Sequence, residues 1–446
     1  MRPAAVACVF RCSTENYNPN HRGDVLQTRD LLVKNCGQLL TLARPDGTPR
    51  VGADLRDLAI IENGALLCRG GRILATGRLD DVEPVLDDGT DVEVVDAGGA
   101  VVMPGFVDCH THTVFAQYRL DEYEWRVAGT PYEDIASRGG GIAKSVSHVR
   151  EMEEDSLFAV SRRRLEGCLR HGSTTVEIKS GYGLDLENEL KQLRVIRRLA
   201  ADSPATVVAT FLGGHSVAPE YRDRREEYIS LIIQEMIPAV SAERLAEYND
   251  VFSETGVFSI EEAERILRAG QRAGLKARLH ADELDDTGSA ELAARVGAVS
   301  ADHLKKINRK GIGLMAKTGV FGVLLPGTSF GLPSLDFAPA REMIDAGMRV
   351  AVASDFNPGS STSESMPMMT AIACSHMRLS PAEAIAATTY NPAFVVGRER
   401  EVGSLEPGKR ADFLVLSCED YREVPNRFGV NPVSDVYIEG TRWAGN

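Results

Sequence analysis

The 446-residue chain contains no run of about 20 apolar residues, so we expect no transmembrane segment. The apolar stretch near its start, Ala4–Phe10, is too short for a secretory signal. The eight cysteines form no C-x-x-C pair, which argues against a cysteine-ligated zinc site or a disulfide framework and favours reduced thiols in the cytoplasm. Three arginines leave a mitochondrial transit segment open as an alternative (Arg2, Arg11 and Arg22), although Glu15 and Asp24 are unusual in such segments.

Basic residues are fewer than acidic residues. Lys and Arg number 50 against 64 Asp and Glu, so the formal net charge is −14. A surplus of negative charge repels phosphate backbones and anionic lipids, so we expect a small-molecule partner and neither nucleic acid nor membrane. No G-K-[ST] follows Gly139–Gly141, and no Rossmann fingerprint is present, so the sequence does not indicate a redox or one-carbon enzyme with a nucleotide cofactor.

The two ends of the chain differ from its middle in their pattern of apolar and polar residues. Residues 1–30 are polar and aperiodic, which predicts a flexible N-terminal extension. Residues 31–103 consist of short β-like runs separated by turns, with hairpins expected at Asn63-Gly64 and Gly70-Gly71. Residues 397–446 return to this β character. We therefore predict a small composite β-sandwich domain formed by both terminal segments.

Residues 104–396 alternate between apolar strands and amphipathic helices. The predicted strands are GFVDCHTH, TTVEIKSG, TVVATFLGG, YNDVFSE, LKARLHADE, AVSADHL, GVFGVLLPG and RVAVASDFNPG. The predicted helices are Glu151–Arg170, Glu187–Ala200, Arg225–Val240, Ile260–Ala273 and Ser289–Val296, with Ser259 and Ser380 as N-caps. Eight strands that each lead into a helix predict an α/β fold, a (β/α)8 TIM-like barrel.

Polar residues collect at the carboxyl ends of these strands, where barrel enzymes place their active sites. The first strand ends at His110 and His112, the fifth at His280 and the eighth at Asp355. His110 and His112 are two residues apart, so both imidazoles face one side of an extended strand. Three imidazoles and one carboxylate suit Zn²⁺ or Fe²⁺, either of which makes water reactive at neutral pH. Hydrogen-bonded core histidines, and a turn before Asn357 in the case of Asp355, are the open alternatives.

Other strand ends supply candidate acids, bases and donors. Glu283 follows His280 by three residues and either points into the strand mouth or belongs to a solvated acidic run. His303 and His215 are candidate hydrogen-bond donors to a substrate carbonyl, or else ordinary core histidines.

Arg119 is the candidate partner of a substrate carboxylate. It follows His110 by nine residues, and we expect it in a loop with Tyr118 and Tyr123. A guanidinium there suits bidentate binding of a carboxylate. A surface ion pair with Asp121 or Glu122 is the alternative.

Several segments together resemble a known family. They are PGFVDCHTH, HTHTVFAQYR, RGGGIAKSV, TTVEIKSGYGLD, TFLGGHSVAPEY, LHADELDDTGSAELA, SADHL, LLPGTSFGL, ASDFNPGSS and GSLEPGKRADFLVL. With them the chain resembles the metal-dependent amidohydrolase superfamily and, within it, the imidazolonepropionase family. The resemblance covers about residues 31–446. It implies a hydrolase that opens the ring of 4-imidazolone-5-propanoate with water to give N-formimidoyl-L-glutamate in histidine degradation.

The resemblance also implies roles, residue by residue. It places the metal ligands at His110, His112, His280 and Asp355. It places the substrate contacts at Arg119, Tyr182, His215, Glu283, Asn357, Gly359 and Ser360, with His303 as a further active-site histidine. In the implied reaction, metal-activated water attacks the ring carbonyl, Asp355 or Glu283 moves the proton, and His303 or His215 steadies the developing oxyanion.

Some choices stay open at this stage. The ligand set suits zinc and iron alike. Another cyclic amidohydrolase or an aromatic deaminase of the same superfamily is the nearest alternative, and a non-catalytic metal-binding homologue is another. A homodimer is expected because twofold oligomers are the commonest kind.

Overall fold

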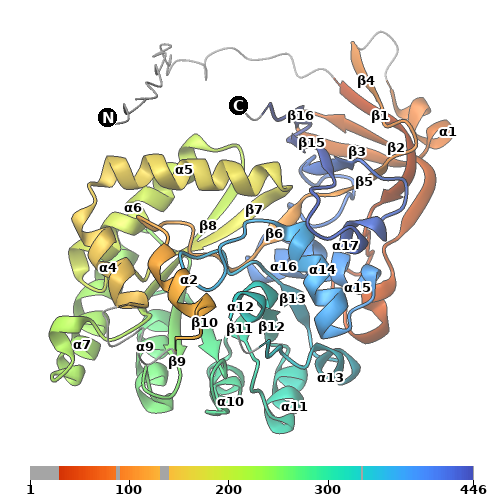
Figure 1. Cartoon of the computed structure of the whole chain (residues 1–446). Coiled ribbons are helices and arrows are strands. Elements are labelled where there is room, and N and C mark those ends of the chain that lie inside the picture. Colours follow the sequence, from red (N-terminus) through yellow and green to blue (C-terminus); the bar gives the residue numbers. More distant parts are fainter. Residues whose placement is uncertain (1–29, 87–90, 131–139, 333–334, 445–446) are drawn as a thin grey trace, which may run out of the picture.

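The computed structural model describes residues 30–86, 91–130, 140–332 and 335–444. Within them, strands and helices form a parallel barrel and a second, separate sheet at its side (Figure 1). The predicted fold class is therefore confirmed. The extension predicted over residues 1–30 lies outside the described residues, except for Asp30, which begins a strand.

The barrel sheet contains eight parallel strands that follow one another in sequence order. They are β6 (Phe106–Asp108), β7 (Ser173–Lys179), β8 (Thr206–Gly214), β9 (Tyr248–Ser253), β10 (Lys276–Ala281), β11 (Ser300–His303), β12 (Phe321–Leu324) and β13 (Val350–Val352). All eight predicted strands are confirmed. They could be recognised because strands covered on both faces read as nearly continuous apolar runs.

The first and last barrel strands meet just beyond their carboxyl ends. Thr111 and Phe356 form an isolated parallel bridge. The amide of Asp355 donates to His110 O (3.0 Å), and the amide of His112 donates to Phe356 O (2.8 Å). Because this contact joins the two ends of the sheet, closure of the barrel brings three of the four predicted metal ligands together.

Helices surround the barrel strands (Figure 1). They are α2 (Leu120–Val127), α4 (Ile142–Glu151), α5 (Glu154–Arg170), α6 (Leu186–Asp202), η3 (Pro219–Tyr221), α7 (Arg225–Leu231), η4 (Ile232–Met236), α8 (Ile237–Ala242), α9 (Ile260–Arg272), α10 (Ser289–Val296), α11 (Arg309–Thr318), α12 (Pro326–Gly331), α13 (Ala340–Asp345), α14 (Met366–Met377), α15 (Pro381–Thr388) and α16 (Tyr390–Val395). Ser259 and Ser380 are N-caps, as predicted, and the structure shows that both form capping boxes.

Two helix predictions and one loop prediction need correction. The predicted helix Arg225–Val240 contains a π-helical turn, η4, ahead of Pro238, which has no N–H to donate to a regular helical ladder. The predicted helix Glu151–Arg170 begins later, at Glu154, because Glu151 ends α4. Tyr123 does not lie in a loop with Arg119, since α2 begins directly after that arginine. Two acidic residues in the first turn of α2 favour this helix start.

The second sheet combines strands from both terminal segments. Its order is β16-β15-β14-β5-β1-β2-β3, with β4 also paired to β1. The strands are β1 (Asp30–Leu40), β2 (Ile60–Arg69), β3 (Arg72–Arg78), β4 (Val92–Asp96), β5 (Val101–Pro104), β14 (Phe413–Leu416), β15 (Val433–Ile438) and β16 (Thr441–Arg442), accompanied by η1 (Gly52–Arg56), α1 (Leu79–Val82), η2 (Glu83–Val85) and α17 (Glu423–Asn426). Leu39, Val102 and Phe413 belong to one buried apolar cluster, so side chains from both ends of the chain share a core.

The two hairpin predictions have different outcomes. Gly70 and Gly71 form the two-residue turn between β2 and β3, both with positive φ, as predicted. The prediction at Asn63-Gly64 is wrong, because both residues lie inside β2. A Cβ at Gly64 would lie 2.7 Å from Leu39 Cβ, so close packing of β1 on β2 accounts for this glycine.

We propose a boundary between the two structural units near residue 104. Strand β5 ends at Pro104 in the second sheet, and β6 begins at Phe106 in the barrel. After α16, the segment 397–412 hydrogen-bonds to the second sheet, for example from Gly408 N to Ile73 O of β3. No helix within the described residues is long and apolar enough to cross a membrane.

Candidate active site

A cavity of about 580 Å³ opens at the carboxyl ends of the barrel strands. The predicted site residues that line it are His112, Arg119, Tyr182, His215, His280, Glu283, His303, Asp355, Asn357 and Ser360. Fully buried His110 contacts the ring of His280, with centroids 4.6 Å apart, and Gly359 contacts Arg119. The structure thus brings the predicted site residues into one region.

Two buried carboxylates orient two of the predicted ligands. His110 Nδ1 donates to Asp302 Oδ2 (2.6 Å), and His280 Nδ1 donates to Asp250 Oδ1 (3.1 Å). These bonds leave Nε2 of both rings buried and without a hydrogen-bond partner among the described residues. Carboxylates that hold the distal nitrogen of a histidine are typical of metal sites.

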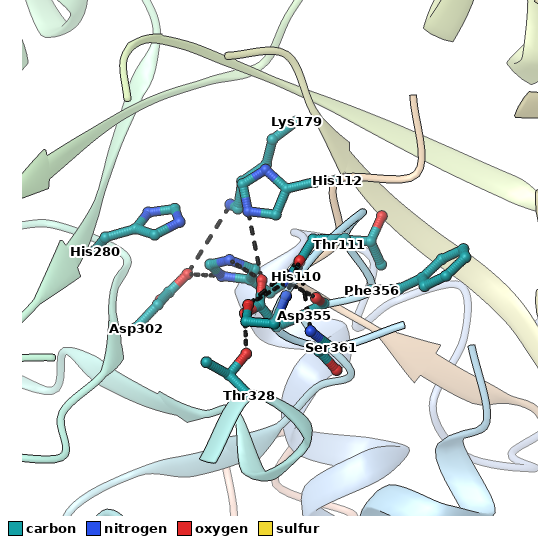
Figure 2. A network of polar contacts seen from close by, with 12 residues as sticks. His110, Thr111, His112, Lys179, His280, Asp302, Thr328, Asp355, Phe356 and Ser361 are labelled. Atoms are coloured by element: carbon teal, nitrogen blue, oxygen red, sulfur yellow. Dashed lines mark hydrogen bonds and ion pairs between the residues drawn. The ribbon is translucent and has the colours of Figure 1, made fainter. Parts of the chain in front are cut away.

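Asp355, just after the last barrel strand, completes the cluster (Figure 2). Its Oδ1 lies 3.5 Å from His110 Nε2 and 3.4 Å from His112 Nε2. Its Oδ2 accepts a hydrogen bond from Thr328, so the second oxygen is already engaged. Burial raises the pKa of Asp355 to about 7. Its backbone has a left-handed φ of 51°, a conformation that is uncommon for residues other than glycine.

The donor set fits a divalent metal. Two overlapping groups have ligand atoms within 4.8 Å of one another, one of His110, His112 and Asp355, the other of His110, His280 and His303. Burial lowers the pKa of His110, His112 and His303 well below the usual value, so these rings are neutral, the form that binds metal. Unpaired buried nitrogens are costly, and a cation would satisfy them. His303 is in position to share this role, although the sequence predicted only a catalytic one.

A buried charge network beneath the cluster was not predicted. Lys179 Nζ contacts Glu177 Oε1 (2.9 Å) and Asp250 Oδ2 (3.0 Å). Arg278 contacts Asp302 Oδ2 (2.9 Å) and Glu177 Oε1 (3.3 Å). These cations hold the two carboxylates that orient His110 and His280. The available signal was the charged residues inside otherwise apolar strands, which are costly to bury unless paired.

His215 faces the cavity as a hydrogen-bond acceptor. Its Nδ1 lies 2.9 Å from Gly181 O, which can only accept, so Nδ1 carries the proton. Burial lowers the pKa of His215 to about 3, so the ring is neutral and Nε2 is bare. The ring stacks on His112 with centroids 5.1 Å apart and lies 5.3 Å from the ring of Tyr182. In this state, His215 can receive a substrate N–H but cannot donate to a carbonyl.

Glu283 points into the cavity, so the solvated alternative is wrong. Its side chain is 12% exposed and lies 3.7 Å from His303 Nε2 and 3.9 Å from Lys305 Nζ. Glu254 Oε2 accepts the amide hydrogens of Glu283 and Leu284, which fixes this turn. Burial raises the pKa of Glu283, which suits a group that takes up and returns a proton.

Arg119 lines the cavity and also makes the ion pair considered from the sequence. Its Nε lies 3.1 Å from Glu122 Oε2, and both side chains are largely buried. Its Nη1 donates to Ser145 Oγ (3.2 Å). A Cβ at position 359 would lie 1.7 Å from Arg119 Nη2, so Gly359 gives the guanidinium its space.

Asn357 shapes the turn after β13. Its Oδ1 accepts from the amides of Gly359 (2.9 Å) and Ser360 (2.8 Å), and its Nδ2 donates to Asp355 O (2.6 Å). The turn connects the predicted ligand to residues that the sequence assigns to substrate. Arg126 and Lys305 also line the cavity, and the sequence prediction did not include them.

Comparisons with known proteins agree with this geometry. The family model described as "Amidohydrolase family" matches residues 101–442. Imidazolonepropionase of Symbiobacterium thermophilum is 47% identical over 412 residues, which cover 92% of this chain and 96% of that protein. Imidazolonepropionase of Geobacillus kaustophilus is 48% identical over 413 residues, covering 92% and 97%. The chain belongs to the imidazolonepropionase family of amidohydrolases.

The sequence prediction of an imidazolonepropionase is thus confirmed at the level of family and enzyme class. Solved structures add the shared fold. E. coli guanine deaminase has a TM-score of 0.71 at 16% identity, covering 93% of this chain and 98% of its own. An adenosine deaminase from Xanthomonas campestris, solved with bound zinc, has a TM-score of 0.68 at 18% identity, covering 93% and 92%.

Proposed function

We propose that the chain opens the ring of 4-imidazolone-5-propanoate with water and releases N-formimidoyl-L-glutamate, a step of histidine degradation. The observation that carries this proposal is the cluster of His110, His112, His280 and Asp355 at one end of a cavity that also holds guanidinium groups. The cluster suits hydrolysis, and the guanidinium groups suit an anionic substrate. Relatives named imidazolonepropionase, 47–48% identical, support the same substrate.

The metal is one divalent ion, zinc or iron, held by His110, His112, His280 and Asp355. Such an ion lowers the pKa of water and polarises a carbonyl group. Removal of one ligand tests this assignment. The His280→Ala variant is expected to lose metal content and turnover together, as measured by elemental analysis beside the activity assay. An inactive variant that keeps a full equivalent of metal would contradict the ligand role.

The remaining residues bind the substrate and move protons. Glu283 is the group best placed to take up the proton released from water, because its carboxylate faces the cavity with a raised pKa. Asp355 is the alternative, although its Oδ2 is occupied by Thr328. His303 lies 3.7 Å from Glu283 and steadies the developing oxyanion. His215 Nε2 accepts a ring N–H, which orients the ring.

Arg119 binds the propanoate group, and four further residues complete the substrate site: Tyr182, Asn357, Gly359 and Ser360. With the carboxylate held, the reacting carbonyl is fixed relative to the cluster, which lowers the entropic cost of the reaction. The test is an ultraviolet assay of imidazolone propanoate loss by the purified, metal-containing protein. Turnover of guanine or adenosine in its place would instead favour an aromatic deaminase.

Two wider assignments belong to the same proposal. A histidine-degrading enzyme with a small-molecule substrate would act in the cytoplasm. A homodimer is proposed from the frequency of twofold symmetry among oligomers. Light scattering of the purified protein distinguishes the dimer from a monomer.

A further inference from the structure

The cations that line the cavity are not equally available to a ligand. Arg119, Arg126 and Lys305 all line it. Arg119 lies 3.1 Å from the carboxylate of Glu122, and Lys305 lies 3.9 Å from that of Glu283. Each of these two pairs is neutral overall, so neither adds net positive charge to the cavity.

Both carboxylate oxygens of Glu122 have partners, one in Arg119 and one in the backbone. Its side chain is 4% exposed, and its second oxygen, Oε1, accepts the amide hydrogen of Gly141 (2.9 Å). A buried carboxylate with these two partners is held in place. The guanidinium expected to bind the substrate is therefore already matched by a fixed negative charge.

Arg126 has a different environment, in the last turn of α2. Its Nη2 donates to Gly359 O (2.8 Å), and its Nε is buried and has no hydrogen-bond partner among the residues that the structure describes. Across the described ranges, no carboxylate lies within ion-pair distance of this guanidinium. The pKa of Arg126 is lowered, first by burial and then by the charge of Arg119, whose effect exceeds the opposing effect of Glu122. A bound anion would offset both the burial of the Arg126 guanidinium and its repulsion by Arg119.

The two arginines meet at one residue. Gly359 leaves room for Arg119 Nη2, and its carbonyl oxygen accepts from Arg126. Arg119, Arg126 and Glu122 together carry a net charge of +1, which one carboxylate cancels.

We propose that Arg126 supplies the uncompensated positive charge that selects the carboxylate of the substrate, while Arg119, neutralised by Glu122, positions it. This inference rests on the proposed function, because it assigns a partner to the propanoate group. It makes Arg126 a specificity-determining residue that acts on binding. A residue that contributes equally to ground-state and transition-state binding changes KM with little effect on kcat.

Two probes of the same shape test the assignment, imidazole propanoate and its uncharged propanamide. Calorimetry on the metal-containing protein measures the affinity of each without turnover. Arg126→Gln is expected to weaken propanoate binding by about 10- to 100-fold, the range for a lost hydrogen bond to a charged group, and to leave propanamide binding unchanged. Arg126→Lys keeps the charge and most of the preference. Arg163→Gln, on the exposed side of α5, removes the same charge away from the cavity and is expected to bind both probes like the wild type.

Several results would overturn the inference. One is an Arg126→Gln protein that keeps the wild-type preference for the anion while Arg119→Gln loses it. A second is a folded Arg126→Lys protein with no preference, which would show that charge is not the basis of selection. Equal binding of the two probes by the wild type is a third. Failure of the proposed function would be distinct, since a wild type that prefers the anionic probe but does not consume imidazolone propanoate contradicts the activity and leaves the role of Arg126 standing.

Discussion

Replacement of Gly359 by alanine perturbs the substrate-binding end of the cavity without removing a polar group. The new methyl carbon would lie 1.7 Å from Arg119 Nη2 and 2.3 Å from its Cζ, whereas non-bonded heavy atoms require about 3.5 Å. Because the nearest atoms belong to the end of a flexible side chain, we expect the Arg119 guanidinium to move and the backbone around residue 359 to stay in place. Arg119 then loses its contacts with Glu122 and Ser145.

The expected change in KM follows from the contact between Arg119 and the substrate carboxylate, which the variant loses. A hydrogen bond to a charged group contributes about 1.5–3 kcal/mol, so we expect KM for imidazolone propanoate to rise by about 10- to 100-fold. The value of kcat should change little, because the ring remains able to reach the metal ligands. Steady-state ultraviolet kinetics measure both. Thermal unfolding should show a loss of less than about 1 kcal/mol, as expected when a side chain and not the core adjusts.

A matched glycine provides the control. Gly313 lies within α11, and a Cβ there meets no heavy atom of the described residues within 4 Å. Gly313→Ala should leave KM unchanged and stabilise the protein by roughly 0.5–1 kcal/mol. In an Arg119→Ala background, Gly359→Ala should have no further effect on KM, since the group it displaces is absent. A wild-type KM for Gly359→Ala, or additive effects in the double variant, would refute the reasoning.

Three further predictions address other parts of the molecule. Asp250→Asn should weaken metal affinity by about 10- to 100-fold, because His280 loses the carboxylate that orients it; chelator competition measures this, and an unchanged affinity would remove Asp250 from the site. Glu283→Gln should lower kcat by about 10²- to 10⁴-fold with little change in KM, whereas a normal kcat would assign proton transfer to Asp355. Burial alone would raise the pKa of Glu383, but hydrogen bonds from Arg341, the Ser380 amide and Arg56 outweigh it and lower the pKa. The stabilisation is therefore complete above the ordinary glutamate pKa and is lost as pH falls toward the lowered one. Acid unfolding of Glu383→Gln should lack this component; an identical acid profile would contradict it.

The barrel and its strand ends could be predicted because they depend on local patterns. Fully buried strands read as apolar runs, and His110, His280 and Asp355 each stand where such a run ends. Helix α2 was missed since it is short and its polarity resembles that of a loop. Among the partners of Arg119, only Glu122 is close enough in the chain to be considered from the sequence. Ser145 and Gly359 come from distant segments, so no local pattern connects them to Arg119.

The network around Lys179 shows a different limit. Charged residues inside apolar strands indicate buried ion pairs, but the sequence does not say which charges meet. Lys179 pairs with Asp250 from β9, and Arg278 pairs with Asp302 from β11. These contacts arise only when strands distant in the sequence assemble into one sheet. The turn at Asn63-Gly64 was misassigned for a related reason. Glycine is required at position 64 because Leu39, on another strand, packs against it and leaves no room for a side chain.

Product analysis of the purified enzyme tests the central proposal most directly. The protein, with its metal content determined, is incubated with 4-imidazolone-5-propanoate, and the products are identified by mass spectrometry. We predict stoichiometric formation of N-formimidoyl-L-glutamate that stops when the metal is chelated and resumes when zinc or iron is restored. A metal-containing protein that leaves this substrate intact, or converts it to another product, would contradict the proposed function.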